Sequence, residues 1–296
     1  MDFGRLLSPR TLVVALVGAL VLTVVFVGST STAAFGVYNP SWDGASGVQS
    51  VVGETSAESR VVMDTNAYAG VEANATVAFV VSPTEAYDDA AISRLRDFVR
   101  AGGTLIVAED FGAEGNEILH GVGAQTRFDG RLVRDPRNHG PTTAMPTVEV
   151  TNSSRLSGTD AVMLNHGTVL EPENATVLAE TSEFAYIDRD GDGEMDGNES
   201  FRTYPVAAGE SVGEGRVVAV SDASVFINAM RDRSSNEAFI RALVDGQETV
   251  LLDYSHASTA PPLQVALVWL RSTPLAQSGM GLGSLAVVFL WHRRRS

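Results

Sequence analysis

Val77-Ala78-Phe79-Val80-Val81 is a short, continuous apolar run that ends at Ser82-Pro83, a pattern that predicts a buried strand followed by a turn. A helix is predicted from Tyr87 to Arg100, because Ile92, Leu95, Phe98 and Val99 share one helical face. Gly102-Gly103 ends this helix, and the run Thr104–Val107 predicts a second buried strand. A strand, a helix and a strand in such short succession form a βαβ unit, so the two strands are expected to pair in parallel.

Outward from this unit, further short apolar runs alternate with turn signals. The predicted strands are Arg60–Asp64, Ala161–Asn165, Thr176–Ala179, Phe184–Ile187, Thr203–Ala207 and Arg216–Val220, and a helix is predicted over Asn236–Val244. Phe184–Ile187 and Thr203–Ala207 flank an acidic loop as in a hairpin. Alternating strands and helices predict an α/β domain with a mainly parallel sheet and helices on both faces.

The composition excludes several kinds of function. The 296 residues include no Cys, which excludes disulfides, thiolate metal sites and cysteine nucleophiles. The 36 acidic residues outnumber 21 basic ones, all Arg, and the net charge of −15 argues against a nucleic-acid partner. The absence of Lys with excess acid is typical of proteins from salt-in halophilic archaea, where carboxylates keep the surface hydrated. Codon bias in a GC-rich genome is the alternative explanation.

The two ends of the chain carry membrane signals. Residues 11–42 are uncharged, with Arg5 and Arg10 before them and Asp43 after them, and residues 272–292 are uncharged with three Arg after them. Each run is long enough to span a bilayer, and the flanking charges place both termini in the cytoplasm. We therefore predict a two-pass protein of the cell membrane, with the lipid bilayer as a partner and an extracellular middle. A signal peptide cleaved near Thr32-Ala33-Ala34 is the alternative for the first run.

This interpretation divides the chain into four parts. Residues 1–35 are a cytoplasmic N-terminus and transmembrane helix, 36–258 an extracellular domain, 259–271 an interfacial segment, and 272–296 a transmembrane helix with an Arg-rich tail. Sites for N-glycosylation are consistent with an extracellular middle, although chance matches are the alternative. The four candidates are Asn74, Asn152, Asn174 and Asn198.

The order of several motifs carries a resemblance to a known family. The motifs are Tyr38-Asn39-Pro40-Ser41-Trp42-Asp43-Gly44, the βαβ unit with Glu109-Asp110-Phe111-Gly112 after it, Gly215–Asp222, and Asn236–Phe239. Over residues 36–258 the chain resembles glutamine-amidotransferase-like domains that lack the enzyme's machinery, and more specifically the DUF4350 membrane proteins of archaea and bacteria. The resemblance implies a class I glutamine-amidotransferase-like fold between two membrane anchors.

The same resemblance bears on catalytic activity. Active class I amidotransferases place a Cys on a tight turn between a strand and a helix, and the matching position here is Asp110, so glutaminase activity is excluded. The crevice at the carboxyl edge of the sheet remains a candidate ligand-binding site, because open α/β sheets bind ligands there. Its candidate residues are Glu109, Asp110, Ser221 and Asp222. An acidic rim without a ligand is the alternative.

A second motif predicts a metal site. Residues 188–199 match the twelve-residue calcium loop Asp-x-Asp-x-Asp-Gly-x5-Glu without a gap. Calcium is coordinated by six to eight oxygens, which this loop offers at closely spaced positions. The predicted Ca²⁺ ligands are Asp188, Asp190, Asp192, the backbone carbonyl of Glu194, Asp196 and Glu199. The flanking segments look like strands, so the loop is predicted to cap a β-hairpin, and a solvated acidic tip without calcium is the alternative.

Three functions are consistent with these observations. The first is a non-catalytic membrane-anchored ectodomain that binds a ligand or protein partner at the cell surface. The second is an accessory subunit of a membrane complex or transporter. The third is a hydrolase that uses Asp110 or a triad from distant segments, which requires Asp110 to lie within hydrogen-bond reach of a His or a metal. We prefer the first, because the sequence shows two anchors and no catalytic spacing of its histidines.

Overall fold

The computed structural model describes residues 9–151, 156–257, 262–263 and 266. The chain divides into two compact units, residues 32–258 and residues 1–31 with 259–296. The smaller unit contains helix α2, Pro9–Ser29. Its residues 11–29 have a mean hydropathy of 2.7 and none is buried, so this helix is long and apolar enough to cross a membrane. The predicted second span, 272–292, and nearly all of the interfacial segment 259–271 lie outside the described residues.

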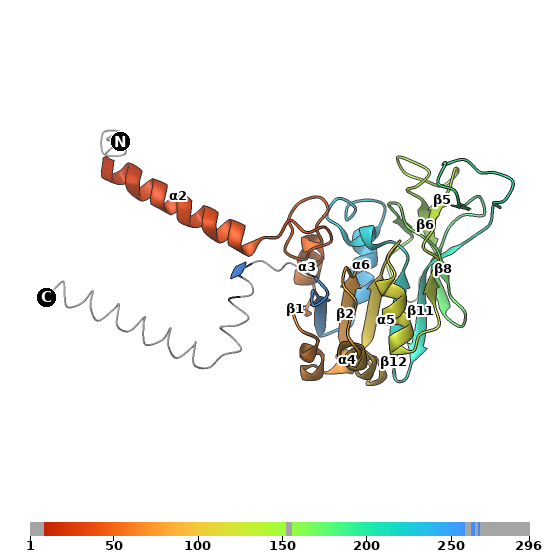
Figure 1. The fold of residues 1–296 in the computed structure, drawn as a ribbon, viewed down its shortest axis with the longest axis horizontal. Helices are drawn as coiled ribbons and strands as arrows, with labels where there is room; N and C mark the ends of the chain where they lie inside the picture. The colour runs from red at the N-terminus through yellow and green to blue at the C-terminus, as the bar shows by residue number, and fades with distance from the viewer. Residues whose placement is uncertain (1–8, 152–155, 258–261, 264–265, 267–296) are drawn as a thin grey trace. The chain divides into compact units, whose positions relative to one another are not determined.

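A nine-stranded sheet forms the centre of the larger unit (Figure 1). Five neighbouring strands are parallel, in the order β1 Glu58–Val62, β13 Thr249–Asp253, β2 Thr76–Val81, β3 Thr104–Ala108 and β12 Gly215–Val220. The sheet continues through antiparallel strands, in the order β11 Pro205–Val212, β9 Thr176–Glu180, β6 Thr147–Val150 and β7 Ala161–Met163. The predicted α/β class and the parallel pairing of β2 with β3 are confirmed.

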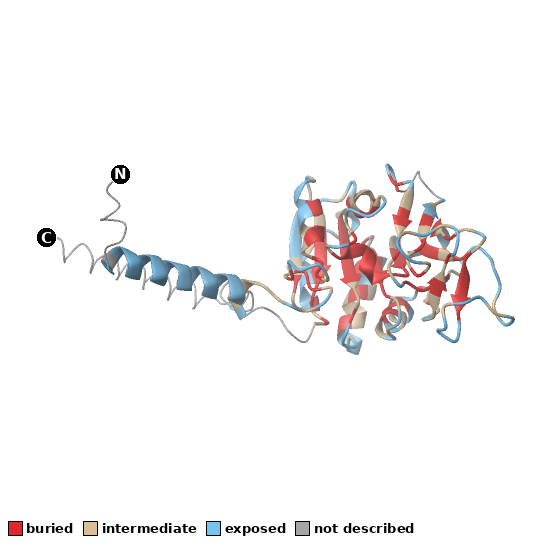
Figure 2. Cartoon of the chain, turned by 90° about the horizontal axis from the view of Figure 1, so that it is seen from above, coloured by how far each residue is buried: buried red, intermediate tan, exposed pale blue. Residues whose placement is uncertain are grey.

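Helices cover both faces of the parallel strands. On one face lie α4, Asp89–Arg100, and α5, Glu114–Val122, whose Leu95 and Ile118 pack into one cluster with Val80 of β2. On the other lie α3, Ser46–Gly53, and α6, Asn236–Val244, where the rings of Phe79 and Phe226 are 5.6 Å apart. Figure 2 shows the buried residues gathered in the strands and on the inner sides of these helices. Each fully buried large apolar side chain contributes about 1.5–3 kcal/mol.

The βαβ unit follows local sequence signals closely. The side chain of Asp88 accepts a hydrogen bond of 2.7 Å from the backbone N–H of Ala91 and so caps the start of α4. Gly102, at φ +108°, ends the helix in a conformation that residues with a side chain rarely adopt. Short 3₁₀ helices η1 Thr65–Gly70, η2 Ala73–Ala75 and η3 Ala223–Phe226 occupy other connections.

The predicted hairpin around the acidic loop is wrong. Strand β10, Tyr186–Asp188, pairs with β5, Leu132–Arg134, in a separate two-stranded sheet. Both hydrogen-bonding edges of β11 are already occupied by β9 and β12, so β11 offers no edge to β10. A further small sheet pairs β4, Arg127–Phe128, with β8, Leu170–Glu171.

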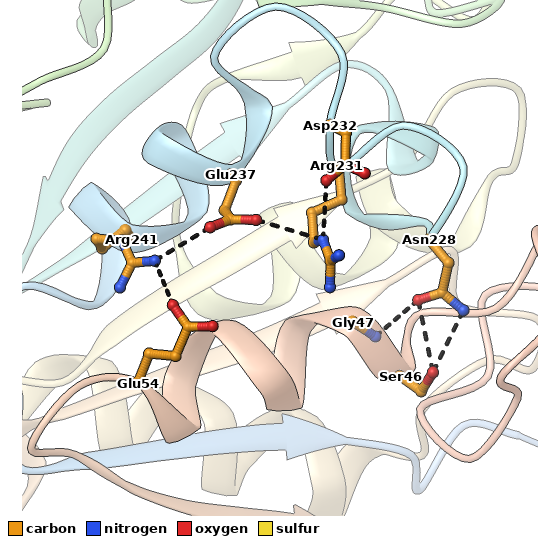
Figure 3. A network of polar contacts seen from close by, with 8 residues as sticks. All are labelled: Ser46, Gly47, Glu54, Asn228, Arg231, Asp232, Glu237 and Arg241. Carbon is orange, nitrogen blue, oxygen red and sulfur yellow. Dashed lines mark hydrogen bonds and ion pairs between the residues drawn. The ribbon is translucent and has the colours of Figure 1, made fainter.

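A polar network ties the segment that follows α2 in the sequence to the α6 region (Figure 3). The side chain of Asn228 accepts a hydrogen bond of 2.7 Å from the N–H of Gly47 and donates one of 2.6 Å to the carbonyl of Ser41. Arg241 bridges Glu54, the residue that follows α3, and Glu237 of α6 at 2.7 and 3.1 Å. The motif around residues 38–44 therefore has a structural role, as a turn fixed against the domain.

Candidate functional site

The carboxyl ends of the five parallel strands meet at one edge of the sheet, where ligands bind in open α/β folds. Glu109 and Asp110 follow β3, and Ser221 and Asp222 follow β12. The N–H of Glu109 donates to the carbonyl of Val220 at 3.2 Å, so the two loops leave the sheet side by side. The structure thus brings together the four residues that the sequence predicted for this edge.

Glu109 is a buried acid at this edge, with 2% of its surface exposed. Its Oε1 accepts a hydrogen bond of 3.0 Å from the N–H of Asp110, while its Oε2 is buried with no hydrogen-bond partner. Burial raises the pKa of Glu109 to about 7, with the nearby Asp110 carboxylate acting in the same direction. Glu109 therefore changes its charge near neutral pH.

Asp222 is fully buried, and backbone groups hold both of its carboxyl oxygens. Oδ1 accepts from the N–H of Ser224 at 2.7 Å, and Oδ2 accepts from the N–H of Asn165. Burial raises the pKa of Asp222 to about 7, although these two hydrogen bonds oppose the change. Beside it, the hydroxyl of Ser221 is buried without a hydrogen-bond partner.

Asp110 is half-buried, and its Oδ1 accepts a hydrogen bond of 2.8 Å from the N–H of Phe111. Among the described residues, no histidine forms a hydrogen bond with Asp110. The edge holds a compact group of carboxyls with neighbouring backbone donors.

The acidic loop brings together three of the predicted ligand residues. Ligand atoms of Asp188, Asp190 and Asp192 lie within 4.8 Å of one another. Glu199 accepts a hydrogen bond of 2.7 Å from the N–H of Arg189 through Oε1, and its Oε2 is buried without a partner. The buried Asp188 also pairs with Nε of Arg134 at 2.6 Å. Glu194 is exposed and Asp196 is half-buried. One of the predicted ligands, Asp188, is therefore already paired with the guanidinium of Arg134.

Sequence reasoning missed a second site at the same edge, a cavity of about 410 Å³ beyond the ends of β1, β13 and β2. Its charged lining consists of Asp64, Glu85, Asp88 and Arg94, and Tyr87 and His256 also line it. The volume is in the range of small-molecule sites. The residues come from three distant segments, and the available signal was that each segment comes after a strand of the parallel sheet.

A buried polar network centred on the carboxylate of Asp253 lies beside this cavity. The hydroxyl of Tyr68 donates to Oδ2 of Asp253 at 2.6 Å, and the N–H and Oγ of Ser255 donate to its Oδ1 at 2.8 and 2.6 Å. Burial raises the pKa of Tyr68 well above its usual value, and the Asp253 carboxylate adds to the effect. The network fixes the loop after β13, and with it His256, against the cavity.

The candidate glycosylation sites are placed as follows. Asn74, Asn174 and Asn198 are exposed, and the side chain of Asn174 donates to Gln125 at 2.6 Å. Asn152 lies outside the described residues.

The fold is that of an α/β domain with a polar carboxyl edge, in a chain with an apolar N-terminal helix. The profile of the family described as "Domain of unknown function (DUF4350)" matches residues 37–244, and the chain belongs to this family. No curated protein matches the chain.

Solved structures with detectable similarity differ widely in kind. The N-terminal domain of mmIFT52 is 16% identical, with 60% of this chain and 78% of that chain covered and a TM-score of 0.46. The cytoplasmic protein STM1381 from Salmonella typhimurium LT2 is 12% identical, with 68% and 84% covered and a TM-score of 0.39. A β-galactosidase from the Antarctic haloarchaeon Halorubrum lacusprofundi is 16% identical, with 57% and 21% covered and a TM-score of 0.34. These values are too low for the similarities to indicate a function.

Proposed function

We propose that this chain is a non-catalytic, membrane-anchored protein of the cell surface, whose extracellular α/β domain binds a ligand or a protein partner. The observation that carries the binding role is the cavity of about 410 Å³ at the carboxyl edge, where ligands bind in this class of sheet. The apolar helix α2, with no buried residue from 11 to 29, supports an anchor. The preceding Arg5 and Arg10 favour a cytoplasmic N-terminus.

We further propose a two-pass topology, a glutamine-amidotransferase-like fold and a halophilic archaeal source. The second span at 272–292 and its Arg cluster would place the C-terminus in the cytoplasm, so that residues 36–258 lie outside the cell. The glutamine-amidotransferase-like fold is supported by the motif order and by the βαβ unit that precedes Glu109-Asp110. A halophilic archaeal source is supported by the Lys-free, acid-rich composition.

Protease treatment of intact cells tests the topology. Protease added outside should degrade residues 36–258, because the proposal places all of them outside the bilayer, and immunoblotting of epitope-tagged chains follows the loss. A cytoplasmic protein in the same cells is the control and should remain intact. Protection of residues 36–258 until the membrane is permeabilised would contradict the proposal.

The accessory subunit of a membrane complex or transporter is the alternative within the same topology. Crosslinking in membranes followed by co-purification distinguishes the two, since an accessory subunit should recover one defined partner in a fixed ratio. The hydrolase alternative gains no support from the surroundings of Asp110 described above.

We also propose that the acidic loop binds Ca²⁺ in a structural role. The support is the convergence of Asp188, Asp190 and Asp192 oxygens within 4.8 Å, together with the buried, unpartnered Oε2 of Glu199. The φ of +82° at Gly193 provides the sharp turn that calcium loops make at this position. A bound divalent cation would offset the mutual repulsion of these carboxylates.

Calcium titration of the full-length protein in detergent tests this site. Saturating Ca²⁺ at about one hundred times its Kd should stabilise the fold by about 2.7 kcal/mol, which raises Tm by about 5–10 °C. The double variant Asp190→Ala/Asp192→Ala should lose this response. Glu194→Ala is the matched control, because only its backbone carbonyl is a predicted ligand. An equal rise in Tm for wild type and double variant, or no rise in wild type at constant ionic strength, would refute the site.

A further inference from the structure

The side chain of Arg94 lines the cavity beyond β1, β13 and β2. Arg94 of α4 is half-buried, and its Nη1 donates a hydrogen bond of 2.9 Å to Oγ1 of Thr65. It forms no ion pair with any described residue, although three carboxylates line the same cavity. A guanidinium offers several N–H donors in one plane, which match the two oxygens of a carboxylate. Arg94 is therefore available to a carboxylate that enters the cavity.

One residue that lines the cavity, His256, carries a buried acceptor. His256 is 7% exposed, and its Nε2 lies 3.1 Å from the backbone carbonyl of Asp253. Because a carbonyl oxygen only accepts, Nε2 carries the ring proton. Burial lowers the pKa of His256, which favours the neutral ring. Its Nδ1 is then a lone-pair acceptor, and it is buried with no partner.

Tyr87 adds a donor beside this acceptor. Its ring centroid is 6.1 Å from that of His256, and its hydroxyl is buried near Ser255 and Asp253, with which it makes no hydrogen bond of regular geometry. Burial, with the nearby Asp253 carboxylate, raises the pKa of Tyr87 well above its usual value, so the hydroxyl keeps its proton. Buried polar groups of native proteins are nearly always paired, so the unpaired Nδ1 of His256, a residue that lines the cavity, points to a bound molecule.

We propose that this cavity binds a small zwitterion that carries both a carboxylate and an ammonium group, such as an amino acid or a short peptide. The donors Arg94 and Tyr87 serve the carboxylate. The acceptor His256 and the carboxylates of Asp64, Glu85 and Asp88 serve the ammonium group.

Ligands with a single charge fit the lining less well. A simple anion would face three carboxylates against one guanidinium, and a simple cation would share the cavity with an unpaired Arg94. A zwitterion places each of its charges against groups of the opposite sign. The inference deepens the proposed function by naming the ligand class, and it rests on that function for its setting at the cell surface.

Calorimetric titration of the full-length protein in detergent tests the inference with three matched probes. Alanyl-alanine is the zwitterion, N-acetyl-alanyl-alanine keeps only the carboxylate, and alanyl-alanine amide keeps only the ammonium group. We expect saturable binding of alanyl-alanine at millimolar concentration or below, and at least tenfold weaker binding of both blocked forms. Arg94→Gln should weaken the binding of alanyl-alanine at least tenfold and leave the binding of the amide unchanged.

Two further variants keep the test interpretable. Arg100→Gln, at an exposed position of the same helix, should bind alanyl-alanine as wild type does. Tyr87→Phe removes one hydroxyl and should weaken binding with an unchanged circular dichroism spectrum. Equal binding of the zwitterion and either blocked form, wild-type binding by Arg94→Gln, or no binding of alanyl-alanine would each overturn the inference. Because the purified protein is used, such a failure is distinct from a failed protease experiment on topology.

Discussion

Arg134→Met should lower the free energy of unfolding by about 3–5 kcal/mol, because it leaves a buried carboxylate without its cation. The side chain of Asp188 is fully buried, and Nε of Arg134 lies 2.6 Å from its Oδ2. The remaining partner of Asp188, the N–H of Gly191 at 2.8 Å, cannot replace a full positive charge. Denaturant unfolding of the full-length protein, followed by far-ultraviolet circular dichroism without calcium, measures the change.

A pair on the protein surface supplies the control for this prediction. Arg60 and Glu58 also form an ion pair, at 2.9 Å, but their side chains are 47% and 63% exposed. Arg60→Met should therefore cost less than about 1 kcal/mol. Equal effects of the two substitutions would show that the Arg134–Asp188 pair is not the buried contact described here.

The Arg134–Asp188 pair and the proposed calcium site share Asp188. If Ca²⁺ binds the acidic loop, it supplies positive charge beside Asp188 in place of the lost guanidinium. Adding Ca²⁺ to Arg134→Met should then recover part of the lost stability, and the triple variant with Asp190→Ala and Asp192→Ala should not recover it.

Stability should fall as the pH rises from about 5 to about 7, with the buried acids at the carboxyl edge as the cause. Burial raises the pKa of Glu109 from 4.5 to about 7, so between these values the folded state binds a proton that the unfolded state has lost. The stabilisation is fully present below the unfolded pKa and is lost as the pH passes the folded pKa. For Glu109 alone the change corresponds to about 3 kcal/mol. Asp222, with a pKa raised to about 7, acts in the same direction.

The variant Glu109→Gln measures how much the ionisation of Glu109 contributes to the pH dependence of stability. The amide keeps an oxygen that can accept from the N–H of Asp110, and it cannot ionise. At pH 8 the variant should be more stable than wild type by up to about 3 kcal/mol, and the difference should shrink toward pH 5. Glu117→Gln, an exposed position on α5, should change little at either pH. A variant that is less stable than wild type at pH 8 would contradict the assignment.

The sequence predicted the central unit of the fold well, because its signals are local. Strand β2, helix α4 and strand β3 lie where the apolar runs and the spacing of Ile92, Leu95 and Phe98 placed them. Helix α6, Asn236–Val244, has the predicted bounds. These patterns record which backbone conformation buries apolar side chains on one face, and they need no knowledge of distant segments.

Pairing between distant strands was less predictable. The two segments that flank the acidic loop were expected to pair with each other, yet β10 pairs with β5 and β11 with β9 and β12. Period-two patterning shows that a segment is a strand, but it does not show which edge the strand will meet. The predicted group of Glu109, Asp110, Ser221 and Asp222 did come together, because the ends of neighbouring parallel strands share one edge.

Composition and short-range spacing were enough to predict the α/β class, the apolar N-terminal helix, the absence of cysteine chemistry and the acidic loop. The position of the cavity, in contrast, depends on the tertiary structure. Strand β13 inserts between β1 and β2, and this order places His256 beside Tyr87 and Arg94, which are far from it in the chain. The physical reason is that strand order follows from long-range packing of both sheet faces, which no local pattern encodes.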